Sequence, residues 1–235
     1  MSKILQAGQT GFGILIEHDA GFISPDHNPT FINESFELKE NEPVLINCVL
    51  QKWGVKNKNG RIYPKDILVP EVERYLELVN SNSAVSEADH PESSIISLDN
   101  ISHMITKMWW GNADDENVLY GQIKVIISPG FIKYGIASVI GDKIVLYLMN
   151  KIRLGISSRG VGSLKELSGE NVVQDDFELI GFDLVATPST PGAYLFPSKN
   201  GETMGFGETL KKKKGIYLKE EDIKTLNAIN KFILW

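Results

Sequence analysis

Residues 153–163 read Arg-Leu-Gly-Ile-Ser-Ser-Arg-Gly-Val-Gly-Ser, and this run marks a change from helical to extended sequence. Apolar residues recur at helical spacing over about 141–153. They are Ile144, Val145, Leu148, Met149 and Ile152. Gly155 follows where a left-handed helix cap is expected. The sequence therefore predicts a helix-to-strand junction, with a strand beginning inside this run.

The hydroxyls of this run are candidates for nucleophilic chemistry. A serine attacks a carbonyl only when a base takes its proton and nearby donors hold the resulting oxyanion. Successive strand residues face opposite sides, so only one serine of the pair can face a base, and we choose Ser157 over Ser158. The backbone around Ser158, Arg159 and Gly160 is then the expected oxyanion region. Gly160 and Gly162 leave room for an extended peptide to approach, although an ordinary turn or strand edge would also explain the run.

The candidate base is His90, in the stretch Glu-Ala-Asp-His-Pro at 87–91. Of the four histidines, two lie in the first 30 residues and His103 lies within a predicted strand, which leaves His90 in an acidic loop. The following proline holds it out of the helical region. Glu87 or Asp89 could orient the ring or raise its pKa. No second His or Cys stands at ligand spacing, so we expect no metal site.

A third group should orient the imidazole, and Asp183 is the best candidate. It is the one charge within Leu-Ile-Gly-Phe-Asp-Leu-Val-Ala at 179–186. A carboxylate among apolar residues needs a partner if it is buried. No histidine follows His103, so a downstream third member must be a carboxylate. A structural aspartate is the alternative, and Asp175, Asp176 and Glu178 rank lower because they lie nearer a polar loop.

The length and composition of the chain indicate one main domain with tails. The chain has 235 residues, a formal net charge of −6 and a pI near 5.3, which disfavours nucleic acid as a partner. No stretch reaches the roughly 20 apolar residues that span a bilayer. The single cysteine, Cys48, lies in an apolar run and is expected to be buried in a strand. A soluble, intracellular protein without membrane contact is the expectation.

Apolar patterns divide the chain further. We predict an N-terminal arm or pro-segment over 1–43, a domain over 44–197, and a linker with a C-terminal amphipathic helix over 198–235. Within the domain the patterns predict strands at 43–53, 101–110, 118–127 and 177–186, and a helix at 66–80.

Five motifs resemble those of one family. They are Asn-Lys-Asn-Gly-Arg-Ile-Tyr-Pro-Lys at 57–65, Ala-Asp-His-Pro at 88–91, Lys-Met-Trp-Trp at 107–110, Ile-Ser-Ser-Arg-Gly-Val-Gly-Ser-Leu at 156–164 and Phe-Asp-Leu-Val-Ala-Thr-Pro-Ser at 182–189. The chain resembles the prohead core proteases of tailed myophages, which are relatives of the herpesvirus assemblin proteases. The order His90, Ser157, Asp183 also differs from that of chymotrypsin-like, subtilisin-like and α/β-hydrolase enzymes.

The resemblance implies an α+β fold with a mostly antiparallel, barrel-like β core and packed helices. It implies a serine endopeptidase without a cofactor, with Ser157 as nucleophile and His90 as base. Herpesvirus relatives use a second histidine as third member, whereas phage relatives carry an acidic residue, which matches Asp183. Arg159 matches a family arginine expected to support the oxyanion region through its backbone or guanidinium.

The resemblance also implies substrates and a place of action. Such proteases cut scaffold or core proteins and the major capsid protein inside the assembling prohead, in the host cytoplasm. They are made as zymogens that trim themselves, and they favour cutting after a glutamate two residues beyond Leu or Ile. Self-association is left open.

Candidate self-cleavage sites of this pattern follow Glu17, Glu34 and Glu220. Cleavage after Glu34 and Glu220 is expected to accompany maturation, whereas Glu166 also matches but follows the active-site strand and should be protected by folding. The alternative function is a non-enzymatic head-assembly or scaffold-binding protein on the same fold. A small-molecule esterase is the third.

Overall fold

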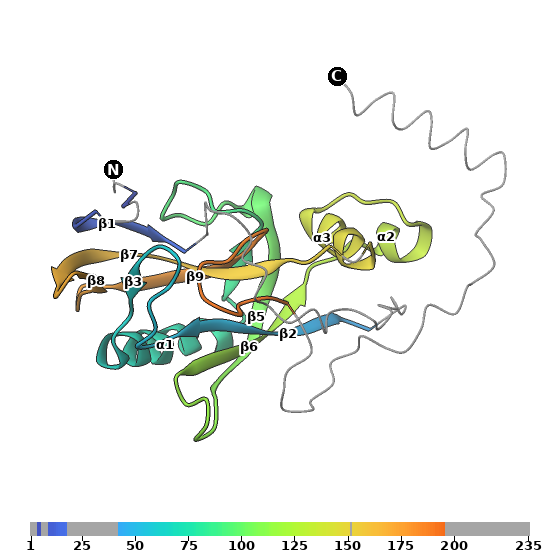
Figure 1. Cartoon of the computed structure of the whole chain (residues 1–235). Helices are drawn as coiled ribbons and strands as arrows, with labels where there is room; N and C mark the ends of the chain where they lie inside the picture. The colour runs from blue at the N-terminus through green and yellow to red at the C-terminus, as the bar shows by residue number, and fades with distance from the viewer. Residues whose placement is uncertain (1–3, 6–8, 18–41, 151, 196–235) are drawn as a thin grey trace.

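The computed structural model describes residues 4–5, 9–17, 42–150 and 152–195, and its strands form two hydrogen-bonded sheets (Figure 1). The five-stranded sheet has the order β1 (Gly11–Ile16), β7 (Gly155–Leu167), β8 (Glu170–Val173) and β3 (Arg61–Ile62), with β9 (Glu178–Val185) also paired to β7. The four-stranded sheet has the order β2 (Val44–Lys52), β6 (Val118–Val125), β5 (Ile101–Trp110) and β4 (Val85–Glu87).

Strand pairing in both sheets is antiparallel except between β3 and β8. The structure therefore confirms an α+β fold built mostly from antiparallel strands. The described strands do not show the expected closed barrel: they form two ladders, which isolated bridges join at Ala88↔Leu184 and, through residues 194–195, at Gly155↔Tyr194 and Cys48↔Leu195. The sheets lie against each other, with β2 beside β7 and β4 beside β9.

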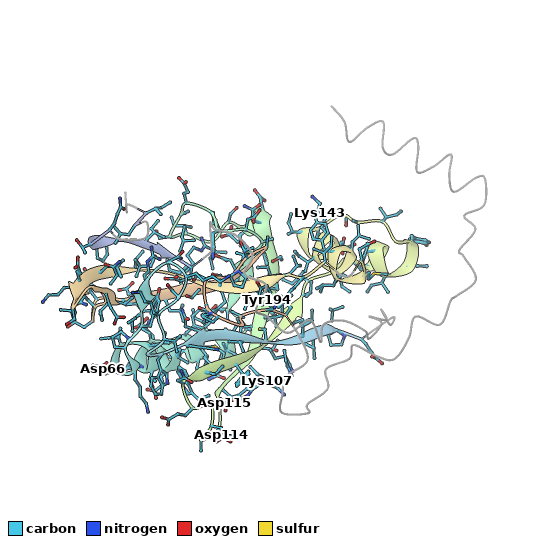
Figure 2. The ribbon with its side chains drawn as sticks, viewed as in Figure 1. Asp66, Lys107, Asp114, Asp115, Lys143 and Tyr194 are labelled. Carbon is cyan, nitrogen blue, oxygen red and sulfur yellow. The ribbon has the colours of Figure 1, made fainter. Side chains whose placement is uncertain are left out.

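The apolar patterns placed several elements correctly. The apolar run at 43–53 is β2, and the runs at 101–110 and 118–127 are β5 and β6, joined by the expected turn. Figure 2 labels Asp114 and Asp115 at the tip of this turn, away from the sheets. Cys48 is 1% exposed in β2, where burial raises the pKa of its thiol. None of the described helices is long and apolar enough to cross a membrane.

Helix α1 (Lys65–Asn80) covers one side of the sheets. Its buried residues recur at spacings of three and four and face the core: Leu68, Val72, Tyr75 and Val79. Pro70 lies inside the helix. A short 3-10 helix, η1 (Leu98–Asn100), immediately precedes β5.

Helices α2 (Pro129–Tyr134) and α3 (Ile140–Met149) lie together at one end of the sheets (Figure 1). Asp142 joins them, because its carboxylate accepts hydrogen bonds from the backbone N–H groups of Ser128, Ser138 and Val139. Helix α3 ends at Asn150, and Gly155 opens β7 instead of capping the helix. The predicted helix-to-strand junction is present, but four residues separate the Asn150 cap from the first strand residue, Gly155.

The N-terminal residues 11–16 belong to the sheet, which corrects the prediction that all of 1–43 is an arm. Strand β1 pairs with β7 from Gly11↔Leu164 to Ile16↔Arg159. Leu15 is fully buried in the core. The boundary at residue 43 therefore does not separate this strand from the domain. Residues 18–41 and the tail at 196–235 lie outside the described residues, and so does the predicted C-terminal helix.

Candidate active site

The ladder between β7 and β9 places Ser157 directly opposite Asp183. Opposed residues of an antiparallel pair project to the same face, with Cβ atoms about 5 Å apart. Arg159 stands two residues beyond Ser157 and so projects to that face as well. All three side chains are buried. The sheet itself therefore gathers a hydroxyl, a carboxylate and a guanidinium in one place.

His90 reaches this group from the loop that follows β4. The loop is fixed beside β9, because Asp89 N–H donates to the Leu184 carbonyl at 2.8 Å and Asp89 adopts a left-handed φ of 62°. His90 Nδ1 lies 2.8 Å from Asp183 Oδ2, and the two side chains are 1% and 0% exposed. With its proton on Nδ1, the ring carries its basic lone pair on Nε2.

The Asp183 carboxylate has several partners besides His90. It accepts a hydrogen bond from Glu87 N–H at 3.1 Å and one from Arg159 Nη2 at 3.2 Å, and Arg159 Nε lies 2.8 Å from Oδ2. A buried carboxylate is costly unless it is paired and hydrogen-bonded. These contacts supply that compensation and hold the carboxylate in one orientation toward the imidazole.

Arg159 lies between two carboxylates rather than at an open oxyanion position. Its Nη2 is 2.5 Å from Glu87 Oε2, its Nη1 donates to the Ser93 carbonyl at 2.8 Å, and its guanidinium also contacts Asp183. The guanidinium thus stabilises Asp183 and Glu87. Arg159 was expected to support the oxyanion region through its backbone or through its guanidinium. Because the guanidinium is engaged with these groups, the backbone is the part left for that role.

Glu87 and Asp89 do not orient His90 in the way the acidic loop suggested. The Glu87 carboxylate pairs with Arg159 and accepts a hydrogen bond from Ser97 N–H at 3.0 Å. Asp89 is exposed. The imidazole receives its carboxylate from a strand 93 residues away instead.

The two adjacent serines occupy different environments. Ser158 Oγ accepts a hydrogen bond from Gln51 Nε2 at 2.8 Å, on the face opposite Asp183. Ser157 Oγ is buried and has no hydrogen-bond partner among the described residues, so no hydrogen bond joins it to His90 in this conformation. Most buried hydroxyls have a hydrogen-bond partner, so the environment of Ser157 differs from that of Ser158.

Gly160 and Gly162 make room for Phe177. A Cβ on Gly160 would lie 2.4 Å from Phe177 Cε2 and 2.6 Å from the Glu178 carbonyl, and a Cβ on Gly162 would lie 2.9 Å from Phe177 Cα. The space that was expected to admit a substrate backbone is therefore filled by the chain itself.

His103, which no sequence pattern placed in the site, supports it from β5. Its Nε2 lies 2.8 Å from the Phe182 carbonyl, and its Nδ1 lies 2.9 Å from Ser102 Oγ. Burial lowers the pKa of His103 to about 4, against the opposing effect of the Asp183 charge. A neutral His103 ring therefore contacts the backbone of Phe182, the residue that precedes Asp183. Its position in an apolar strand was the only signal available from the sequence.

Of the three candidate self-cleavage sites, only Glu17 lies among the described residues. The Glu17 side chain is fully buried and pairs with Arg61 Nη1 at 2.9 Å. Glu34 and Glu220 lie outside the described residues. Within the part of the chain that the structure describes, no three His, Cys, Asp or Glu side chains gather as metal ligands would.

Comparisons with known proteins agree on one family. A family model described as prohead core protein serine protease matches residues 30–204, a span that contains His90, Ser157 and Asp183. The chain is 34% identical over 163 residues to the prohead core protein protease of Enterobacteria phage T4, covering 68% of this chain and 71% of that protein. The solved structure of the bacteriophage T4 capsid assembly protease matches with a TM-score of 0.57 and 26% identity, over 77% of this chain and 100% of that one.

Proposed function

Because the chain belongs to the prohead core protein serine protease family, we propose that it is a phage head-maturation endopeptidase whose nucleophile is Ser157. The observation that carries the proposal is the cross-strand pair Ser157↔Asp183, with the same aspartate hydrogen-bonded to His90. A serine, a histidine and a carboxylate on one buried face are the groups that acyl transfer requires.

In the proposed mechanism, His90 Nε2 takes the proton of Ser157 as its Oγ attacks the scissile carbonyl carbon. Asp183 accepts the hydrogen bond from His90 Nδ1–H and stabilises the imidazolium that forms. His90 then protonates the leaving amine, and water hydrolyses the acyl-enzyme by the same proton route. The Ser157–His90 contact forms when substrate binds, as catalytic hydrogen bonds often tighten only in the complex.

The developing oxyanion is held by backbone N–H groups in the Ser158–Gly160 region. Arg159 acts as a positioning residue, because its guanidinium touches the carboxylate that orients the base. Its effect on the reaction passes through Asp183 and His90.

The proposed substrates are phage scaffold or core proteins and the major capsid protein, cut inside the assembling prohead in the host cytoplasm. The proposed site pattern is Leu or Ile, any residue, then Glu, with cleavage after the glutamate. Self-processing after Glu34 and Glu220 follows from the same pattern.

Incubation of the purified chain with a Leu-x-Glu peptide tests the activity, with products identified by mass spectrometry. Hydrolysis after the glutamate, lost in Ser157→Ala and in His90→Ala but kept in Ser158→Ala, supports the proposal. Binding without hydrolysis would favour a scaffold-binding protein, and hydrolysis of small esters alone would favour an esterase.

Self-processing has a separate readout in the intact mass of the chain. The proposal expects the unmodified sequence to lose its ends on incubation, while Ser157→Ala stays at full length. A Ser157→Ala protein that still loses both ends in a purified preparation would contradict self-processing.

A further inference from the structure

The Glu17 carboxylate sits in a buried cage of side-chain donors. Its Oε1 accepts from Arg61 Nη1 at 2.9 Å and from the Tyr63 hydroxyl at 2.5 Å. Its Oε2 accepts from Asn57 Nδ2 at 2.5 Å, Asn59 Nδ2 at 3.0 Å and the Ser189 hydroxyl at 2.8 Å. Five donors from two separate segments thus converge on one glutamate side chain.

Residues of the same cage also donate hydrogen bonds to the backbone at Ile16 and Glu17. The Ile16 carbonyl accepts hydrogen bonds from Arg61 Nη1 at 2.9 Å and Asn59 Nδ2 at 3.1 Å. Ser189 N–H donates to the Glu17 carbonyl at 3.1 Å. An extended backbone held at a strand edge, with a specific pocket for a side chain, is how proteins recognise peptides by strand addition.

Strand β1 ends beside the candidate nucleophile. Figure 1 shows β1 running along β7, and Glu17 N–H donates to the Ser158 carbonyl at 3.2 Å. On the other side of Ser157, Ile156 N–H donates to the Ala193 carbonyl at 2.8 Å. Figure 2 labels Tyr194 of that covering segment, which bridges to Gly155. Along this edge of β7, Ser157 therefore lies between the end of β1 and the segment that contains Ala193 and Tyr194.

The register fixes what a bound peptide would present to Ser157. Ile16 is paired with Arg159, and one step further brings Glu17 to Ser158. A peptide bound in this register would place the residue after its glutamate opposite Ser157. The peptide bond on the carboxyl side of the glutamate is thus the one nearest the nucleophile.

The charges of the cage call for an anion. Arg61 is 2% exposed, and a buried cation is costly unless an anion compensates it. Burial opposes the charge on Arg61, but Glu17 and Tyr63 together outweigh it and raise the pKa of the guanidinium. A buried ion pair is weak evidence for stability, since apolar residues of similar volume often serve as well. The five donors around Glu17 therefore form a site whose charge and hydrogen-bond groups match a carboxylate.

We propose that Asn57, Asn59, Arg61, Tyr63 and Ser189 form the subsite that binds the glutamate side chain of substrates, and that Glu17 occupies this subsite as an internal ligand. The inference rests on the proposed protease function. It specifies the substrate as an extended peptide whose glutamate is preceded, two residues earlier, by an apolar side chain like the fully buried Leu15. Strand β1 must then be displaced before a substrate can bind.

Peptide binding to the full chain tests the subsite without requiring hydrolysis. The probes are a fluorescent peptide with the sequence of residues 11–18, Gly-Phe-Gly-Ile-Leu-Ile-Glu-His, and the same peptide with Gln in place of Glu. Fluorescence anisotropy is measured on Ser157→Ala and on Ser157→Ala/Glu17→Gln. Because Glu17 no longer competes, the double variant should bind the Glu peptide more tightly than Ser157→Ala does, and roughly tenfold more tightly than it binds the Gln peptide.

Adding Arg61→Met to the double variant should abolish the preference for the Glu peptide. Equal affinities for the two peptides in Ser157→Ala/Glu17→Gln would overturn the proposal, as would a Glu17→Gln change that leaves Glu-peptide affinity unaltered. A protein that prefers the Glu peptide but does not cleave it with Ser157 intact would support the subsite and contradict the proposed protease function.

Hydrogen exchange covers the case in which Glu17→Gln does not fold. In the Ser157→Ala chain, excess Glu peptide should raise amide exchange across residues 11–17, because the peptide displaces β1, and the Gln peptide should not. Unchanged exchange at the highest soluble concentration of Glu peptide would show that the cage is only a structural ion-pair site.

Discussion

His90 Nδ1 and Asp183 Oδ2 lie 2.8 Å apart, although 93 residues separate them in the chain. The carboxylate comes from the middle of β9, and the imidazole comes from a loop that β9 itself holds through the Leu184 carbonyl. One strand therefore supplies the carboxylate and also positions the base. This coupling makes the site sensitive to changes in the network behind Asp183.

Replacing Asp183 with Asn should lower kcat by roughly three to four orders of magnitude, because the amide favours the wrong imidazole tautomer and cannot stabilise the imidazolium. KM for a Leu-x-Glu peptide should change little. Steady-state kinetics measures both. Asp175→Asn is the matched control, since Asp175 is exposed and should retain activity. Equal activity of the two variants would exclude Asp183 from the reaction.

Replacing Arg159 with Met should lower the free energy of unfolding by about 3 to 5 kcal/mol, because it leaves two buried carboxylates without their cation. Adding Glu87→Gln should recover part of the loss by removing one of those charges. Urea denaturation measures both effects. Arg74→Met is the control: its ion pair with Glu71 is 45% exposed on the arginine side, and its loss should cost about 1 kcal/mol or less.

His103 should make the protein less stable as the pH falls. Its pKa is lowered from 6.5 to about 4 by burial, so between these values the unfolded chain binds a proton that the folded chain does not. The contribution is complete above pH 6.5 and is lost toward pH 4, by about 3 kcal/mol. The free energy of unfolding of the unmodified protein should fall by that much more than that of His103→Gln. Parallel curves would show that His103 is not buried as a neutral ring.

Replacing Gly160 with Ala should cost about 1 to 3 kcal/mol, because the new methyl group meets Phe177 and the Glu178 carbonyl. Thermal or urea unfolding gives the value. Gly130→Ala is the control, since the nearest atoms to its added Cβ lie 4.0 Å away. A neutral Gly160→Ala would show that β7 and β9 separate more easily here than the structure indicates.

Elements with a strong apolar period were predictable from the sequence. The buried face of α1 and the runs of β2, β5, β6 and β9 each carry enough apolar residues to define a type and a rough position. Strand β1 was not predictable, because its short Gly-rich run becomes a strand only by pairing with the edge of β7. The β7–β8 hairpin was missed too, although Ser168 and Gly169 both have positive φ, as a two-residue turn of this kind requires.

The candidate site residues were named from the sequence, but their connections were not. Alternation along a strand predicted that Ser157 and Ser158 face opposite sides, and they do. The pairing of Glu87 with Arg159 depends on the packing of β4 against β9, which no local pattern records. The same holds for Glu17 and Arg61, which are 44 residues apart.

The assignment of Ser157 as nucleophile is tested most directly by covalent labelling. The protein is treated with a fluorophosphonate and digested, and the adduct is located by tandem mass spectrometry. We predict an adduct on Ser157 that persists in Ser158→Ala and is lost in His90→Ala. An adduct on Ser158, or labelling of Ser157 that is unchanged in His90→Ala, would contradict the assignment.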